Sequence, residues 1–288
     1  MKRSDRVRLN FTRNWKLPGK ERFSQWFKPS GEANRSFSGG IVWLTDEDVA
    51  IYTTADNFIE QIILTTGTYE DEINKPIRLS LKPGNVALDI GANIGLQSLR
   101  MSQCVGPQGS VIAFEPLEYL RNKFNRNMAL NKVSNVKLMP YALSDQESSA
   151  EFKINPATWN QGAFSIAGKD DGTELQKVDI KVGDDLPEIR SLLRLDLIKI
   201  DVEGFEFQVM KGLKTTLEKF RPRIVFEYDM KYWPANGQSI SECFDFLRKL
   251  DYEIYQVNPA CSELRNSAME IEDGNVFCIN NQDEKSRL

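Results

Sequence analysis

The chain has 288 residues, of which 41% are hydrophobic and 27% are charged, and its formal net charge is -4. No apolar run approaches the roughly 18 residues of a membrane span, and the N-terminus lacks the apolar core of a secretory signal. Four separated cysteines without a CxxC pair exclude a disulfide framework and a zinc knuckle. We therefore expect a globular protein of the cytoplasm.

Residues 1–40 form a basic arm that is rich in aromatic residues. Residues 1–30 hold nine Lys and Arg against two Asp and Glu, whereas the other 258 residues hold 28 against 39. We favour an arm that packs on the body or against a second copy, as in a homodimer. The alternative is a surface for an anionic lipid, giving peripheral membrane contact, or for a glycan or nucleic acid. A nucleic acid is the partner we do not expect.

Residues 41–84 read as a lead-in module, with short strands at IVWL and VAIYTT and a helix near residues 57–64. From Val86 onward, apolar runs alternate with helical patterns, which is typical of an α/β fold with a mostly parallel sheet. An insertion at about 150–187 reads as a β-hairpin. The seven predicted strands of the domain at 85–288 are VALDI, VIAFEP, VKLMPYAL, LDLIKID, RPRIVFEYD, YEIYQV and NVFCIN. The predicted helices lie at 94–104, 117–128, 205–219 and 240–250.

The first of these strands ends in a glycine turn, DIGANIG. Gly91 permits a tight turn and Gly95 allows close packing, and backbone N–H groups at the start of the next helix face a ligand there. A dinucleotide motif would place its other glycines at Asn93 and Leu96, so a pyrophosphate is disfavoured. Asp89 would repel a phosphate and attract an ammonium or sulfonium group.

The second strand ends in Glu115, twenty residues after Gly95. A carboxylate at this position accepts both ribose hydroxyls of a nucleoside. A cationic group and a nucleoside together describe S-adenosylmethionine. An NAD-dependent oxidoreductase and a non-catalytic nucleoside-binding protein are the alternatives.

Six segments of the chain resemble the FkbM-type S-adenosylmethionine-dependent methyltransferases, over about residues 66–279. The segments are TGTYEDE, VALDIGANIG, VIAFEPLEYLRNKFNRNMALN, YALSD, LIKIDVEGFEFQVMKG and IVFEYD. The combination of FEP with KIDVEGFE is the specific part of this resemblance, which does not extend to the first 40 residues.

The resemblance implies a class I methyltransferase fold, a Rossmann-like sandwich of a seven-stranded sheet with helices on both faces and a reversed last hairpin. It also implies O-methylation of a small-molecule or glycan acceptor, such as a sugar, a glycolipid, a polysaccharide or a secondary metabolite. The cofactor-binding residues that we predict are Glu70, Asp89, Gly91, Ala92, Asn93, Gly95, Glu115, Pro116, Ala142, Leu143, Asp145 and Asp201.

The candidate catalytic residues follow the fourth and fifth strands. In LIKIDVEG, period-2 geometry directs Lys199, Asp201 and Glu203 to one side, and a buried lysine needs a partner such as Asp201. Glu227 ends the next strand and converges on the same crevice. The chain has no histidine, so these four residues are the candidates for proton transfer.

These carboxylates are suitable ligands for Mg²⁺, but the sequence has no defined metal-ligand spacing that favours a metal site. On the substrate side we predict Tyr69 and, from the inserted hairpin, Trp159, Asn160 and Gln161, an aromatic platform with amides suited to a sugar ring. A base-methylating N-methyltransferase would have an Asn/Asp-Pro-Pro-aromatic element after the fourth strand, where this chain has DVEG.

Overall fold

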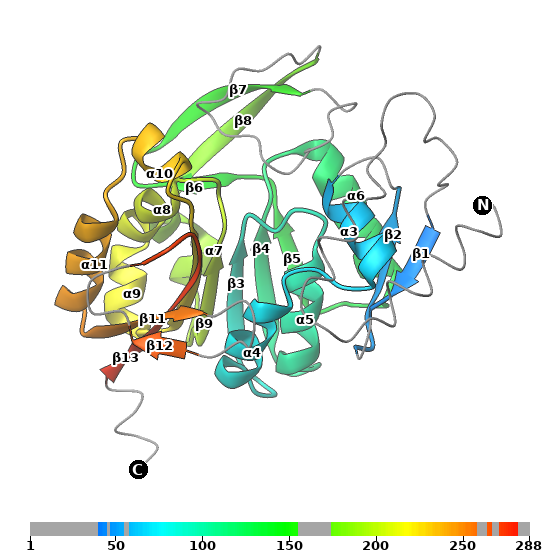
Figure 1. Ribbon diagram of the computed structural model, residues 1–288, viewed down its shortest axis with the longest axis horizontal. Helices are drawn as coiled ribbons and strands as arrows, with labels where there is room; N and C mark the ends of the chain where they lie inside the picture. The colour runs from blue at the N-terminus through cyan, green and yellow to red at the C-terminus, as the bar shows by residue number, and fades with distance from the viewer. Residues whose placement is uncertain are drawn as a thin grey trace.

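The computed structural model describes residues 40–44, 47–54, 58–154, 174–257, 264–266 and 271–281. In that part of the chain, the main sheet has eight strands in the order β12-β11-β13-β10-β9-β3-β4-β5 (Figure 1). The strands are β3 (Val86–Ile90), β4 (Ser110–Phe114), β5 (Val136–Met139), β9 (Leu197–Ile200), β10 (Arg223–Tyr228), β11 (Tyr252–Val257), β12 (Leu264–Asn266) and β13 (Gly274–Asn280).

The sheet has the predicted class I methyltransferase arrangement. Strands β5, β4, β3, β9 and β10 pair in parallel, and β13 runs antiparallel between β10 and β11. The seven predicted regions all contribute a strand, and β12 adds an eighth short strand beyond β11. The order of the strands places the carboxyl ends of β3, β4, β9 and β10 side by side, where α/β folds bind their ligands.

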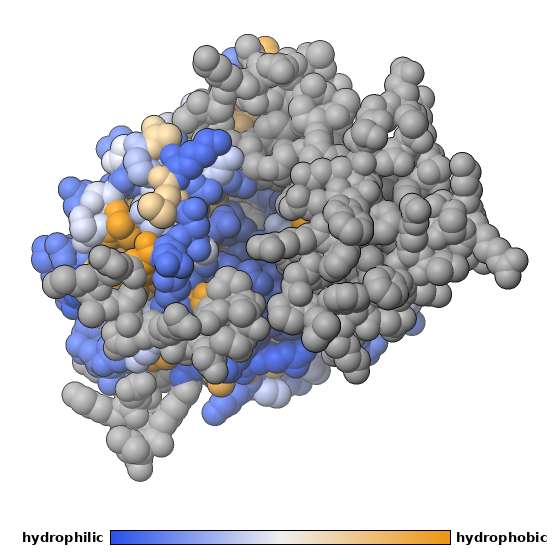
Figure 2. Space-filling model, in the orientation of Figure 1, coloured by the Kyte–Doolittle hydropathy of each residue, from blue (hydrophilic) through white to orange (hydrophobic). Residues whose placement is uncertain are grey.

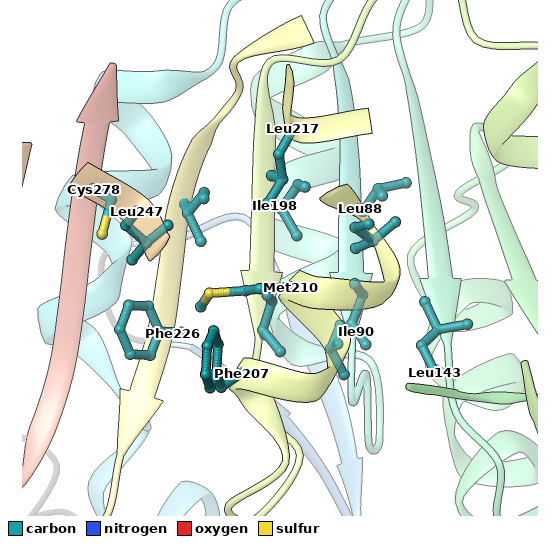
Figure 3. Close-up of a cluster of buried hydrophobic side chains, with 14 of the residues drawn as sticks. Leu88, Ile90, Leu143, Ile198, Phe207, Met210, Leu217, Phe226, Leu247 and Cys278 are labelled. Carbon is teal, nitrogen blue, oxygen red and sulfur yellow. The ribbon is translucent and has the colours of Figure 1, made fainter. Parts of the chain in front are cut away.

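Helices cover both faces of the sheet because alternate strand residues face opposite layers. Leu88, Ile198 and Phe226 pack with the helices α8 (Glu206–Gly212), α9 (Lys214–Phe220) and α11 (Ile240–Lys249), as Figure 3 shows for part of this cluster. On the other face, Ala87 and Leu197 pack against α4 (Asp71–Ser80) and α5 (Leu96–Val105). Helix α6 (Glu118–Leu130) belongs to a third apolar cluster beside α5.

Two predicted elements are wrong as single units. VKLMPYAL divides into β5 and β6 (Ala142–Ser144), with Pro140, which has no N–H for a ladder, between them. The helix predicted at 205–219 breaks between α8 and α9 near Gly212. A Cβ at that glycine would lie 2.0 Å from the carbonyl oxygen of Ser144, so the end of α8 packs directly on β6.

The predicted insertion is a hairpin of β7 (Ser148–Ile154) and β8 (Glu174–Val182), and β6 joins β8 in a three-stranded sheet. The hairpin ends earlier than predicted. It is followed by a 3₁₀ turn, η3 (Gly183–Asp185), and by α7 (Pro187–Arg190).

The lead-in module contains the antiparallel strands β1 (Gly40–Trp43) and β2 (Ala50–Thr53) and the helix α3 (Phe58–Thr66). Helix α4 follows and was not predicted, because Pro76 and a polar sequence obscure its apolar face. That face nevertheless has helical spacing, with Ile73, Pro76, Ile77 and Ser80 buried. The short helix α10 (Tyr232–Ala235) completes the described helices.

No helix of the described segments has the length and apolarity needed to cross a membrane. The described surface on the face shown in Figure 2 is mainly hydrophilic. Cys104, Cys243 and Cys278 are free thiols, and Cys261 lies outside the described residues. The cytoplasmic location and the domain boundaries stay predictions.

Candidate functional site

A cavity of about 650 Å³ lies where β3, β4, β9 and β10 end. Its wall contains most of the predicted site residues: Tyr69, Glu70, Gly91, Ala92, Asn93, Glu115, Pro116, Ala142, Leu143, Asp145, Lys199, Asp201, Glu203 and Glu227. Two predicted cofactor residues, Asp89 and Gly95, are not in the wall. Trp159, Asn160 and Gln161 lie outside the described residues.

The glycine turn between β3 and α5 forms one wall of the cavity. The N–H groups of Gly91 and Ala92 both donate to the carbonyl oxygen of Phe114, at 3.0 and 2.9 Å. Gly91 has a φ of +80°, and a Cβ there would lie 1.8 Å from the carbonyl oxygen of Asp201. Asn93 has a φ of +50°, a conformation that asparagine tolerates better than most residues. Only glycine fits at residue 91, because β3, β4 and the end of β9 meet there.

Gly95 serves packing, but its partner differs from the prediction. A Cβ at Gly95 would lie 2.7 Å from Cε of Met128 and 2.8 Å from the ring of Phe124. Both of these side chains belong to α6, whereas the sequence suggested contact between the helix and its own strand. Gly95 therefore sets the distance between the start of α5 and α6 and does not contact the cavity.

Glu115 faces the cavity from the end of β4 and is held by backbone donors. Its carboxylate accepts hydrogen bonds from the N–H groups of Asn93 and Leu117, each at 2.9 Å. Burial raises the pKa of Glu115 to about 7, against the lowering effect of these hydrogen bonds. The position of this carboxyl group is therefore fixed before any ligand binds.

Lys199 lies at the centre of the site, beneath the glycine turn. Its ammonium group is 3.1 Å from Oδ2 of Asp201 and 3.7 Å from Oδ1 of Asp89, and it donates to the carbonyl oxygen of Gly91 at 3.2 Å. Burial alone lowers the pKa of Lys199, but the attraction of Asp201, Asp89 and Glu70 outweighs it and raises the pKa. Lys199 therefore remains a cation and does not accept a proton.

Asp89 is fully buried behind this lysine. Its carboxylate accepts a hydrogen bond of 2.5 Å from the hydroxyl of Ser98 and pairs with Lys199. Burial raises the pKa of Asp89, and Lys199 and Ser98 oppose that change. Asp89 does not line the cavity, and its carboxylate contacts Ser98 and Lys199, so its direct contact with a ligand stays a prediction.

Glu203 is directed by a turn and not by strand alternation, because β9 ends at Ile200. Glu203 and Gly204 have φ values of +56° and +92°. The buried carboxylate of Glu206 accepts from the N–H groups of Val202 and Gly204, at 2.9 and 3.2 Å. Sequence reasoning did not identify Glu206, although an acidic residue in an otherwise buried first helical turn is a signal that it binds backbone N–H groups.

The cavity wall brings four carboxyl groups close enough to change one another's protonation. Burial and the charge of Asp201 raise the pKa of Glu203 to about 9 and that of Glu70 to about 7. Repulsion from Asp201, followed by burial, raises the pKa of Glu227 to about 10. In the described part of the chain, no three His, Cys, Asp or Glu side chains are grouped so as to hold a metal ion.

Comparison with known proteins identifies a family. The profile of the methyltransferase FkbM domain matches residues 89–254, more than half of the chain. Methyltransferase 1 of Beauveria bassiana (strain ARSEF 2860) is 34% identical over 143 residues, which are 44% of this chain and 57% of that protein. The 2-O-methyltransferase NoeI of Sinorhizobium fredii (strain NBRC 101917 / NGR234) is 28% identical over 158 residues, which are 50% of this chain and 64% of NoeI.

Among solved structures, methyltransferase FkbM from Methylobacillus flagellatus KT is similar, with a TM-score of 0.42 and 14% identity. That match covers 76% of this chain and 52% of the other. All three similarities span less than two thirds of the matched protein.

The raised carboxyl pKa values predict how stability depends on pH. Between about pH 5 and pH 9 the folded state keeps protons on Glu203 and Glu227 that the unfolded state has lost, so the free energy of unfolding should fall as pH rises. Each of the substitutions Glu203→Gln and Glu227→Gln should reduce this slope by up to about 1.4 kcal/mol per pH unit. Urea unfolding at a series of pH values, without added ligand, measures the slope.

Glu218→Gln is the matched control, because Glu218 lies on α9 outside the cavity wall and its side chain is half exposed. It should leave the slope unchanged. A slope that is the same in Glu203→Gln, Glu227→Gln and Glu218→Gln would contradict the strong coupling of the cavity carboxyls.

Proposed function

The chain belongs to the FkbM methyltransferase family, and we propose that it transfers a methyl group from S-adenosylmethionine to a hydroxyl oxygen. The acceptor class that we propose is a sugar, a glycolipid or polysaccharide, or a secondary metabolite. One observation supports this most: the glycine turn, Glu115 and the carboxyl cluster around Asp201 all face a single cavity.

Different residues of the cavity wall fit the ribose, the adenine and the methionine end of S-adenosylmethionine. Glu115, fixed by two backbone donors, would accept the ribose hydroxyls. Ala142, Leu143 and Asp145 would flank the adenine, and the turn at Gly91 together with Glu70 would receive the methionine end. The absence of a Cβ at Gly91 lets the backbone of Asp201 pack against this turn. When bound, S-adenosylmethionine supplies an electrophilic methyl group on a positively charged sulfur.

The charge of the wall supports this cofactor over a nicotinamide dinucleotide. The described lining residues include one cation, Lys199, and seven acidic side chains: Glu70, Glu115, Asp145, Asp201, Glu203, Glu227 and Asp229. Such a wall attracts a sulfonium and an ammonium group and repels a pyrophosphate. The positive charge of Lys199 is already balanced by its ion pairs with Asp89 and Asp201, so it does not offset the acidic wall.

The acceptor hydroxyl would meet the carboxyl groups beyond Asp201. Asp201, held by Lys199 at 3.1 Å, is suited to orient the hydroxyl. Glu203 and Glu227 make no side-chain hydrogen bond or ion pair within the described structure, so either is free to take the proton. Their raised pKa values keep both groups protonated, and an arriving cation would lower these values, so that one carboxylate would then be available to accept the hydroxyl proton. The name of the relative NoeI, a 2-O-methyltransferase, supports oxygen as the acceptor atom.

Calorimetric titration with S-adenosylmethionine, S-adenosylhomocysteine and NAD, each with and without Mg²⁺, tests the cofactor. We expect the first two to bind at micromolar concentration, NAD to show no binding, and Mg²⁺ to make no difference. Glu115→Ala should weaken both by about tenfold or more, because the carboxylate's hydrogen bonds to ribose contribute about 1.5–3 kcal/mol. The conservative Glu115→Gln should retain part of the affinity. Binding of NAD in place of the other two would favour the oxidoreductase.

Release of S-adenosylhomocysteine in the presence of neutral methyl glycosides tests catalysis. A positioned base contributes about 10²- to 10⁴-fold, so Glu203→Gln or Glu227→Gln should lower kcat by that factor with little effect on cofactor affinity. The rate of the unsubstituted enzyme should rise with pH as the base ionises. Loss of less than threefold in both variants would exclude them as the base. Cofactor binding without turnover on any acceptor would favour the non-catalytic alternative.

A further inference from the structure

Arg100 is a buried cation whose contacts, apart from one with Gln97 on the same helix, lie in the segment before the first strand of the main sheet. Its side chain lies on α5 and is 1% exposed. Nη1 donates to the carbonyl oxygens of Tyr69 and Glu70, at 2.9 and 3.2 Å. Nη2 pairs with Glu47 at 2.7 Å and with Asp71 at 3.0 Å. One guanidinium group thus joins α5 to the loop after β1 and to the loop between α3 and α4.

The backbone that Arg100 holds is an unfavourable one. Glu70 has a φ of +51°, in the left-handed region, which costs a residue with a Cβ about 1–2 kcal/mol. Such a conformation persists only where the surroundings determine it. Here the carbonyl groups on either side of the Glu70 Cα, those of Tyr69 and of Glu70 itself, accept from Arg100. The side chain of Glu70 is also held, by a 3.0 Å hydrogen bond from Gln97, one helical turn before Arg100.

The lead-in module is attached to the main domain at a second place, through α6. Asn131 accepts from the N–H of Ala50 at 2.8 Å and donates to its carbonyl oxygen at 2.7 Å, and Asn127 accepts from the N–H of Tyr52 at 2.9 Å. Strand β2 is therefore fixed independently of Arg100. What Arg100 determines is the local path of residues 69–71.

We propose that Arg100 is a positioning residue that holds Tyr69 and Glu70 on the cavity wall, and that the lead-in module is thereby part of the cofactor site. This rests on the proposed function. Tyr69 and Glu70 line the cavity, and both precede residue 89, where the family match begins. Helix α5, which starts at the glycine turn, thus also holds the segment at Glu70 on the cavity wall.

A lysine cannot replace Arg100 in this arrangement. The five N–H donors of arginine form a rigid fork that reaches carbonyl and carboxylate oxygens on several sides at once, whereas lysine has three donors on one atom. Arg100→Lys keeps the charge that Glu47 needs but loses simultaneous contact with both carbonyls. Glu70→Gln removes the charge that Arg100 is proposed to place.

A double-mutant cycle tests the proposal by calorimetric titration with S-adenosylmethionine and S-adenosylhomocysteine. The proteins are the parent, Arg100→Lys, Glu70→Gln and the double variant, with Arg194→Lys as a matched arginine on the exposed surface. We expect Arg100→Lys to weaken binding of S-adenosylmethionine by about 10- to 100-fold, as misplacement of a binding group does. In the Glu70→Gln background it should weaken binding by less than threefold. Arg194→Lys should leave affinity unchanged.

An unchanged affinity in Arg100→Lys, or an equal loss in both backgrounds, would overturn the proposal. Hydrogen exchange of residues 66–72 provides a readout that needs no ligand. It should be at least tenfold faster in Arg100→Lys than in the parent, with no change in the strands of the main sheet, and equal exchange would also overturn the proposal. A parent protein that binds neither ligand would refute the proposed function, and hydrogen exchange would still decide the role of Arg100.

If Arg100→Lys does not fold, Asp71→Asn takes its place in both measurements. Asp71 is more than half exposed, so its replacement costs little stability. Asp71→Asn should weaken binding of S-adenosylmethionine and speed the exchange of residues 66–72, each by about two- to fivefold. The effect on binding should be absent in the Glu70→Gln background. No effect of Asp71→Asn on exchange or affinity would overturn the proposal.

Discussion

The buried ammonium group of Lys199 is the constraint on which the rest of the site depends. A cation without water needs compensation, and here Asp89, Asp201 and the carbonyl oxygen of Gly91 provide it from β3, from the end of β9 and from the glycine turn. These contacts hold together the two strands at which the order of the sheet reverses. They also give Asp201 a defined position at the cavity, while the neighbouring carboxyls Glu203 and Glu227 remain without a cation of their own.

The chain has no histidine, so the carboxyl groups of this site are the candidates for acid and base chemistry. A methyl transfer from a sulfonium requires alignment of the acceptor oxygen more than strong acid or base chemistry, and carboxyl groups suffice for both tasks. Burial and the charge of Asp201 keep a proton on Glu203, and the charge of Asp201 and burial keep one on Glu227. A cation that enters the cavity would lower both pKa values, so under the proposed function cofactor binding would also ionise the base.

The sequence predicted the sheet and most of the cavity wall because both follow from local patterns. Strand periodicity placed Asp201, Glu115 and Glu227 at strand ends, and the glycine spacing disfavoured a pyrophosphate. The same reasoning predicted a contact between Asp89 and a ligand, but a pattern of residues does not reveal that this carboxylate is fully buried against Lys199 and Ser98. It also missed Arg100 and Gln97, whose partners lie in a segment that only the tertiary structure brings near, and Glu206, whose carboxylate accepts from the N–H groups of Val202 and Gly204. Glu203 lines the cavity, but a turn directs it there and not strand alternation: its φ is positive, and Asn236 donates a hydrogen bond to its carbonyl oxygen.

The central claim is that the cavity above the Lys199 ion pairs binds S-adenosylmethionine. A crystal structure of the protein with S-adenosylhomocysteine tests this most directly. The account predicts the ribose hydroxyls within hydrogen-bond distance of Glu115, and the sulfur beside the turn at Gly91 and facing Asp201. A ligand bound elsewhere, or bound in this cavity with its ribose away from Glu115, would contradict the account.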